Sequence, residues 1–197
     1  MTFRIENKFF IKKENLMDFK KHLSIKGATE LYHKRKIESL YFENKKKEMF
    51  SDSMEGSLPR KKIRVRYYPQ INLDQIYFEK KISSIEGRYK KRNVIKKDEF
   101  ENFKNRGIYD QQYGICYPII FVSYEREYLS IGDTRITIDK EIVYQEFEKK
   151  ITFKDPDLII ELKTSFKKDL DEIAKLFPFQ NIRFSKYCNG YKIIFNA

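Results

Sequence analysis

Hydrophobic and charged residues alternate along much of the chain, with the period of two that is typical of β-strands whose two faces meet different surroundings. In the clearest segments a charged residue or a tyrosine occupies every second position, and the positions between are mostly aliphatic or aromatic. These segments cover positions 3–9, 62–67, 77–82, 122–129, 135–139 and 160–163, and further strands are predicted at 32–42 and 88–95.

Helical spacing is found in fewer places. Apolar residues three and four apart predict helices over 14–24, 98–104 and 168–177. Gly56 and Pro59 make 44–60 the predicted long loop, and 143–153 fits neither pattern. Together these patterns predict an α+β protein that is dominated by strands.

The charged faces of the predicted strands carry mainly Arg, Lys and single carboxylates, with little of the Ser, Thr, Asn and Gln that is common on solvated strands. A lysine two positions after a glutamate recurs at Glu6/Lys8, Glu79/Lys81 and Glu161/Lys163. In an open sandwich these faces would be solvated. In a closed barrel they would line the interior, and the apolar faces would pack outward against helices. We favour the barrel, whose many interior cations require a polyanion, or water and counter-ions, to fill the lumen.

Composition supports one ordered domain with an anionic partner. The chain has 197 residues, with 41 Lys and Arg against 29 Asp and Glu, which gives a net charge of +12. This excess favours nucleic acid, anionic lipid or a phosphate compound as partner. The 41% of hydrophobic residues excludes a disordered polyelectrolyte, and the length suits a single domain.

Several classes of protein are disfavoured. There is no apolar run of about 18 residues and no N-terminal secretion signal, so neither a membrane span nor export is predicted. The two cysteines, Cys116 and Cys188, are too few for a disulfide framework, and a reduced cytoplasmic location is expected. The two histidines, His22 and His33, leave little room for a His-rich metal site or a Ser-His relay.

Eight short motifs, in this order along the chain, resemble those of a known family. They are Arg4-x-Glu6-x-Lys8, Ser39-Leu40-Tyr41-Phe42, Lys62-x-Arg64-x-Arg66, Glu79-x-Lys81, Tyr124-x-Arg126, Arg135-Ile136-Thr137-Ile138-Asp139, Glu161-Leu162-Lys163 and Arg183-Phe184-Ser185-Lys186-Tyr187. Over nearly its whole length the chain resembles the catalytic domain of the vacuolar transporter chaperone (VTC) polyphosphate polymerases, in the triphosphate tunnel metalloenzyme superfamily. The SPX domain and membrane anchor of the eukaryotic polymerases have no counterpart here, so regulation and product transport through them are not implied.

The resemblance implies a single domain over 1–197, built as a tunnel of eight antiparallel strands with helices packed outside. Carried over position by position, it implies a catalytic set at Lys62, Arg64, Arg66, Arg126, Arg135 and Lys186. It implies further phosphate-binding residues at Lys8, Lys81, Lys90, Arg92, Lys163 and Arg183. It also implies Mn²⁺ or Mg²⁺ at Glu161, with Glu6 and Glu79 as additional carboxylates. Tyr41, Tyr124 and Tyr187 are interpreted as packing residues.

These residue types suit phosphate chemistry. Arg supplies planar, bidentate donors to phosphate oxygens, and Lys supplies a compact charge. A hard divalent ion can bind through one carboxylate together with phosphate oxygens and water. Phosphoryl transfer asks a protein mainly for positioning and charge stabilisation, which such a lumen would provide.

The expected activity is metal-dependent phosphoryl transfer on a nucleoside triphosphate, polyphosphate or pyrophosphate. Polyphosphate synthesis from ATP is preferred, because an acceptor phosphate is already anionic and needs no general base. A triphosphatase and a non-catalytic polyphosphate-binding module are the alternatives. Nucleic acid is disfavoured, because single-strand binders mix aromatic and basic residues on one face. Association with a membrane partner and the oligomeric state are left open.

Overall fold

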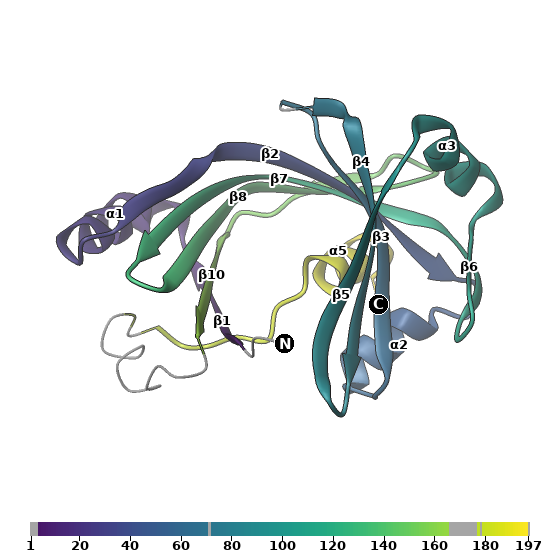
Figure 1. The fold of residues 1–197 in the computed structure, drawn as a ribbon, viewed down its shortest axis with the longest axis horizontal. Helices are drawn as coiled ribbons and strands as arrows, with labels where there is room; N and C mark the ends of the chain where they lie inside the picture. The colour runs from purple at the N-terminus through teal and green to yellow at the C-terminus, as the bar shows by residue number, and fades with distance from the viewer. Residues whose placement is uncertain (1–3, 71, 166–176, 178, 197) are drawn as a thin grey trace. The chain divides into compact units, whose positions relative to one another are not determined.

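The computed structural model describes residues 4–70, 72–165, 177 and 179–196 (Figure 1). Its strands are β1 (Arg4–Ile11), β2 (Thr29–Asn44), β3 (Arg60–Tyr68), β4 (Asn72–Ser84), β5 (Gly87–Ile95), β6 (Ile108–Asp110), β7 (Gly114–Ile131), β8 (Thr134–Glu146), β9 (Thr152–Lys154) and β10 (Leu158–Ser165). Its helices are the 3₁₀ helix η1 (Lys13–Asn15), α1 (Leu16–Ile25), α2 (Glu48–Glu55), α3 (Lys97–Arg106) and α5 (Lys186–Phe195).

The strands are hydrogen-bonded in the order β1-β10-β8-β7-β2-β3-β4-β5, with β6 on β7 and β9 on β8. The pairs β1–β10 and β10–β8, and those of β2 through β5 in sequence, are antiparallel. This confirms the strand-dominated α+β class and an eight-stranded path. Among the described residues the order ends at β1 and β5, so the sheet is open where a closed barrel was expected. The edge of β1 pairs instead with a later segment, in which the Ile182 N–H donates to the Lys8 carbonyl at 2.7 Å.

The described chain forms two compact units. Unit 1 comprises Met1–Arg35, Tyr124–Ile142 and Asp155–Phe184, and unit 2 comprises Lys36–Ser123, Val143–Lys154 and Ser185–Ala197. The long strands β2, β7 and β8 contribute residues to both units. The single domain over 1–197 stays a prediction.

Unit 1 has its apolar core on one face of β1, β8 and β10. This core contains Phe9, Ile11, Ile136, Ile138, Ile160 and Leu162, which pack with Phe19 and Leu23 of α1. Because side chains alternate along a strand, the charged positions between these residues project from the opposite face. This is the orientation that the alternation predicts.

Unit 2 is built in the same way. Its core contains Leu40 and Phe42 of β2, Ile63 and Val65 of β3, Ile76 and Ile95, together with Met49 of α2 and Phe100 of α3. Ile63 and Val65 are fully buried, so the residues flanking them in β3, Lys62, Arg64 and Arg66, project from the other face.

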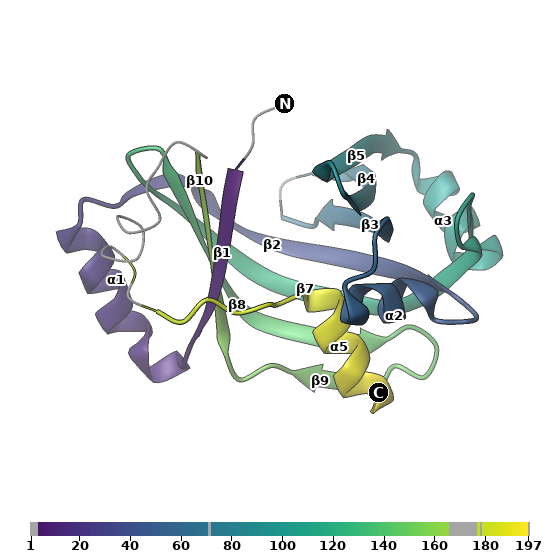
Figure 2. The same ribbon diagram turned by 90° about the horizontal axis from the view of Figure 1, so that it is seen from below.

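Helix α5 departs from the prediction that the helices pack on the apolar faces. It lies beside α2 (Figure 2), and the Tyr187 ring stacks on Tyr41 with 5.2 Å between ring centroids. Tyr41 alternates with the core residues Leu40 and Phe42, so α5 covers part of the charged face of unit 2. Gly190 permits this approach, because a Cβ there would overlap Cδ1 of Tyr144.

The local predictions have mixed outcomes. Helices α1 and α3 confirm the segments 14–24 and 98–104, and the segment 168–177 lies outside the described residues except for Phe177. The ambiguous segment 143–153 contains the end of β8 and the start of β9. Among the described residues, no helix has both the length and the apolar composition needed to cross a membrane.

The predicted loop over 44–60 is wrong, because α2 occupies its middle. The Glu43 carboxylate accepts hydrogen bonds from the Met49 and Phe50 N–H groups at 3.2 and 2.8 Å and so caps this helix from the preceding strand. Gly56 ends it in the left-handed conformation, with φ 88°.

Candidate functional site

A row of cations crosses three neighbouring strands of unit 2. In the register of β3, β4 and β5, Lys62 lies opposite Lys81, which lies opposite Lys90. One step along, Arg64 lies opposite Glu79, which lies opposite Arg92. Residues that are directly opposite share a face of the sheet. We call this surface the basic face; it comprises Lys62, Arg64, Arg66, Lys81, Lys90 and Arg92.

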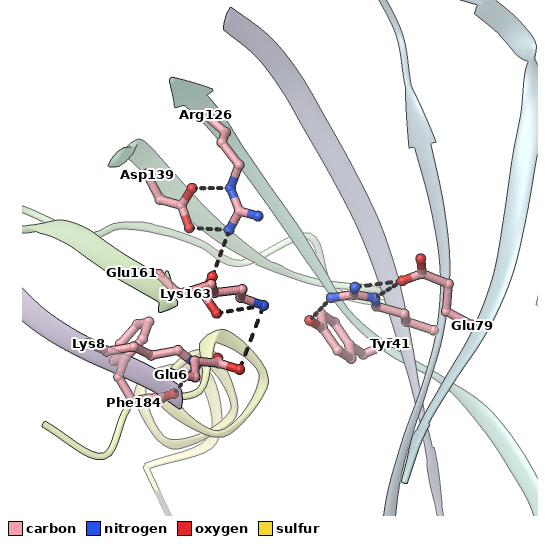
Figure 3. A network of polar contacts seen from close by, with 10 residues as sticks. Glu6, Lys8, Tyr41, Glu79, Arg126, Asp139, Glu161, Lys163 and Phe184 are labelled. Atoms are coloured by element: carbon pink, nitrogen blue, oxygen red, sulfur yellow. Dashed lines mark hydrogen bonds and ion pairs between the residues drawn. The ribbon is translucent and has the colours of Figure 1, made fainter. Parts of the chain in front are cut away.

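Glu79 is the carboxylate at the centre of the basic face. Arg64 donates to Glu79 Oε2 from Nε at 2.7 Å and from Nη2 at 2.5 Å (Figure 3). Lys90 and Arg92 lie 3.2 and 3.3 Å from Oε1. Burial alone would raise the pKa of Glu79, but Arg64, Arg66 and Lys90 outweigh it and lower the pKa to about 2. Glu79 therefore stays ionised and holds the cations around it in place.

Two hydroxyl groups from β2 position the arginines. Tyr41 Oη accepts from Arg64 Nη1 at 2.9 Å, and Ser39 Oγ accepts from Arg66 Nε at 3.1 Å. Burial opposes ionisation of Tyr41, yet the positive potential of Arg64, Arg66 and Lys62 lowers the pKa of this phenol below its usual value. The direction of this shift is the one expected for a phenol beside a cluster of cations.

The N-terminus of α5 joins the same surface. Lys62 Nζ donates to Ser185 Oγ at 2.8 Å, and Ser185 is the N-cap of α5. The Tyr187 hydroxyl binds Glu43, the residue that caps α2. Burial and the Glu43 carboxylate raise the pKa of Tyr187, so it remains a neutral donor. These contacts fix α5 against β2 and α2.

Unit 1 carries a second charged surface, which we call the carboxylate cluster. It comprises Glu6, Lys8, Arg126, Asp139, Glu161 and Lys163 (Figure 3). Lys8 lies opposite Glu161 in the register, and Glu6 lies opposite Lys163. Lys163 Nζ is 3.1 Å from Glu161 Oε1 and 3.6 Å from Glu6 Oε2. Arg126 Nη2 is 3.6 Å from Glu161 Oε2.

The charges in this cluster stabilise one another. Burial alone would raise the pKa of Glu161, but a hydrogen bond with Glu6 and the cations Lys163, Arg126 and Lys8 hold the pKa well below its usual range. Arg126 makes a two-pronged pair with Asp139, from Nε at 2.5 Å and Nη2 at 2.6 Å. Asp139 therefore orients Arg126, which leaves Glu6 and Glu161 as the carboxylates available to a ligand.

Two buried polar atoms of β8 have no hydrogen-bond partner among the described residues: Arg135 Nε and Thr137 Oγ1. Arg135 lies opposite Lys163 and Thr137 lies opposite Glu161, so both belong to the charged face of unit 1. A buried donor without a partner costs about 1–3 kcal/mol, so we expect water or a ligand to complete both groups. An anionic ligand at the carboxylate cluster would satisfy both.

The donor set of this cluster fits a hard divalent cation only together with a substrate. Among the described residues, no group of three or more His, Cys, Asp or Glu is placed to hold a metal alone. Glu6 and Glu161 offer carboxylate oxygens, and Mg²⁺ or Mn²⁺ commonly completes such a site with phosphate oxygens and water. Glu79 fits less well, because Arg64 makes two short hydrogen bonds to its Oε2 and Lys90 and Arg92 contact its Oε1, whereas Lys163 and Arg126 lie 3.1 and 3.6 Å from the Glu161 oxygens.

The structure brings most of the predicted site residues into these two surfaces. The exceptions are Arg135, which lies opposite Lys163 on the charged face of unit 1, Arg183, which is exposed beside β1, and Lys186, which is the half-buried first residue of α5. Sequence reasoning missed Asp139, Thr137, Ser39 and Ser185 as members of the site. Asp139 and Thr137 alternate with Ile136 and Ile138, and that spacing was the available signal.

The chain matches the model of the VTC domain family over residues 3–195. No curated protein matches it. It is similar in fold to an adenylate cyclase candidate from Bacillus halodurans (16% identity, 93% of this chain and 94% of that chain, TM-score 0.61). It is also similar to the PH1012 protein from Pyrococcus horikoshii (14% identity, 94% and 99%, TM-score 0.58). A third similar structure is an adenylyl cyclase candidate from Hippeastrum that reveals a dominant triphosphatase activity (12% identity, 96% and 96%, TM-score 0.59). At these identities the likeness concerns the fold.

The lowered pKa of Glu79 predicts a pH-dependent contribution to stability. Because its pKa is about 2 in the folded protein and about 4.3 in an unfolded chain, its contribution is complete above the unfolded value and is lost as the pH falls toward 2. Glu79→Gln should lower the free energy of unfolding in urea by on the order of 3 kcal/mol at neutral pH. The gap to wild type should narrow below about pH 4. Glu148→Gln, at an exposed residue, is the matched control and should change neither the free energy of unfolding nor its dependence on pH. If the difference in stability between Glu79→Gln and wild type did not change with pH, the lowered pKa of Glu79 would be contradicted.

Proposed function

The chain belongs to the VTC domain family, and on this premise we propose that it is a metal-dependent enzyme that transfers phosphoryl groups of a nucleoside triphosphate or polyphosphate. The specific reaction that we propose is polyphosphate synthesis from ATP. We also propose a cytoplasmic location, with which the two free, buried cysteines agree.

The observation that carries this proposal is the row of three lysines, Lys62, Lys81 and Lys90, across β3, β4 and β5. Like charges that lie directly opposite one another destabilise a sheet. Arg64, Arg66 and Arg92 add to the positive charge, and the Glu79 carboxylate contacts Arg64, Lys90 and Arg92. A chain of phosphates has the charge density and the acceptor oxygens to offset this repulsion.

The carboxylate cluster supplies the chemical step in this proposal. Glu161, assisted by Glu6, would hold Mn²⁺ or Mg²⁺, which supplies charge neutralisation at phosphate oxygens when bound. Arg126, oriented by Asp139, and Arg135 would donate to the oxygens where charge builds up during transfer. Lys8 and Lys163 would exchange their present carboxylate partners for phosphate oxygens.

The proposed direction of the reaction rests on how few groups among the described residues are placed to activate water, since Glu6 and Glu161 are assigned to the metal. Glu79 and Asp139 are each held by arginine, and the pKa of Glu79 is too low for a general base near neutral pH. Neither histidine belongs to either charged surface: His22 lies on α1, and the ring of His33 is fully exposed beside Glu30. An anionic acceptor phosphate needs no base, so synthesis is favoured. The triphosphatase activity reported for the Hippeastrum protein keeps hydrolysis as a second candidate.

Binding is tested with tripolyphosphate and Lys81→Ala. The ligand should stabilise the wild type, by about 2.7 kcal/mol at 100 times Kd, and should raise the melting temperature far more than chloride at equal ionic strength. Lys81→Ala should weaken tripolyphosphate binding about fivefold or more, while leaving the ligand-free protein at least as stable. The control is Lys91→Ala, because Lys91 is an exposed neighbour on the other face of β5. If both variants lost the same tripolyphosphate affinity, the binding would reflect only the overall positive charge of the protein and not the row of lysines.

The chemical step is tested with ATP and Mn²⁺, with the products resolved as a polyphosphate ladder or free phosphate. Wild type should give the ladder; free phosphate alone would establish the hydrolase, and metal-independent binding without turnover would establish a binding module. Glu161→Gln should reduce turnover by about two orders of magnitude and leave metal-free tripolyphosphate binding intact or tighter. Glu148→Gln should behave as wild type. Full metal-dependent turnover in Glu161→Gln would exclude Glu161 as the ligand.

A further inference from the structure

Two tyrosines and an arginine form a compact aromatic group in unit 1. The rings of Tyr32 on β2 and Tyr128 on β7 meet edge to face, with 5.6 Å between centroids. The guanidinium carbon of Arg35 lies 5.3 Å from the Tyr32 centroid and 5.4 Å from the Tyr128 centroid. Tyr32 is 49% exposed. We call these residues the stacking platform: Tyr32, Arg35 and Tyr128.

The platform continues the charged face of unit 1. Leu129 packs against the apolar core beneath α1, so Tyr128 points to the opposite face of β7. Arg126 and Tyr124 lie two and four positions before Tyr128 on the same strand, so they project from the same face as Tyr128. The Arg126 guanidinium is 5.3 Å from the Tyr124 ring centroid. Tyr128 and Arg126 are two positions apart, roughly 7 Å along the strand. A phosphate group at Arg126 would therefore lie close enough to Tyr128 for another part of the same ligand to contact the Tyr128 ring.

A nucleobase fits this surface chemically. Nucleobases stack on tyrosine rings and on the plane of an arginine guanidinium, and the interaction tolerates any base because each has a π-face. Arg35 can cover one face of the Tyr32 ring, and the exposure of Tyr32 leaves aromatic surface in contact with solvent. Tyr32 and Arg35 are not part of the apolar core of unit 1, so core packing does not account for their placement.

We propose that Tyr32, Arg35 and Tyr128 form a stacking platform for the base of a nucleoside triphosphate whose phosphates bind the carboxylate cluster. This inference rests on the proposed function and narrows its substrate: the donor is a nucleotide, and inorganic tripolyphosphate lacks the group that the platform binds.

The absence of tryptophan from the sequence permits a direct test. Tyr32→Trp introduces a single indole at the platform and keeps its stacking ability. ATP should quench the indole fluorescence in a saturable way, and tripolyphosphate at equal occupancy should not. The control is Tyr109→Trp, at a tyrosine of β6 that is 72% exposed. Equal responses to the two ligands, or equal quenching in the two variants, would overturn the platform.

Affinity measurements keep the two proposals separate. Tyr128→Leu should weaken ATP binding by roughly 5- to 150-fold, the effect of losing one base–aromatic stack, and should leave tripolyphosphate affinity unchanged. If ATP and tripolyphosphate bind equally well and Tyr128→Leu changes neither, the platform is wrong and the phosphate-binding function stands. If ATP quenches the indole but tripolyphosphate binds to no variant, the platform stands and the proposed phosphate site is wrong.

Discussion

Repulsion between cations that are held in strand register is the constraint on which the rest of unit 2 depends. Lys62, Lys81 and Lys90 lie opposite one another because β3, β4 and β5 pair in the register that buries Ile63 and Val65. A shift of one residue would turn the lysines inward and the isoleucine and valine outward. The apolar core therefore fixes the basic face, and the free energy of core packing offsets the repulsion on the other side of the sheet.

Neutral and anionic groups then hold most of these cations in place. Glu79 stays ionised under the influence of its arginines, and Tyr41 positions Arg64 without adding negative charge. In unit 1 the balance is different, because Glu6, Asp139 and Glu161 stand among Lys8, Arg126 and Lys163. The basic face thus suits the binding of a polyanion, whereas the carboxylate cluster also offers oxygens to a divalent cation.

The faces of the strands could be predicted from the alternation of residues in the sequence. Features that depend on contacts between distant segments could not be predicted in this way. Alternation with buried residues was enough to place Arg64 and Glu161 on charged faces. The sequence did not predict helix α2, because its cap comes from Glu43 on the preceding strand. Nor did it predict that α5 packs on the charged face, which is possible because Gly190 has no side chain. Uncharged site residues such as Thr137 resemble ordinary strand residues. The platform was missed because only the pairing of β2 with β7 brings Tyr32 to Tyr128.

The ionisation of Tyr41 tests the central claim, that the basic face binds a chain of phosphates. It can be followed by the ultraviolet absorbance of tyrosinate, as the difference between wild type and Tyr41→Phe. Burial opposes ionisation, but Arg64, Arg66 and Lys62 lower the pKa of this phenol. A polyanion bound to those cations would offset their potential, so saturating tripolyphosphate should raise the pKa of Tyr41. If tripolyphosphate binds to the protein and the pKa of Tyr41 does not move, the phosphates lie elsewhere and the account is contradicted.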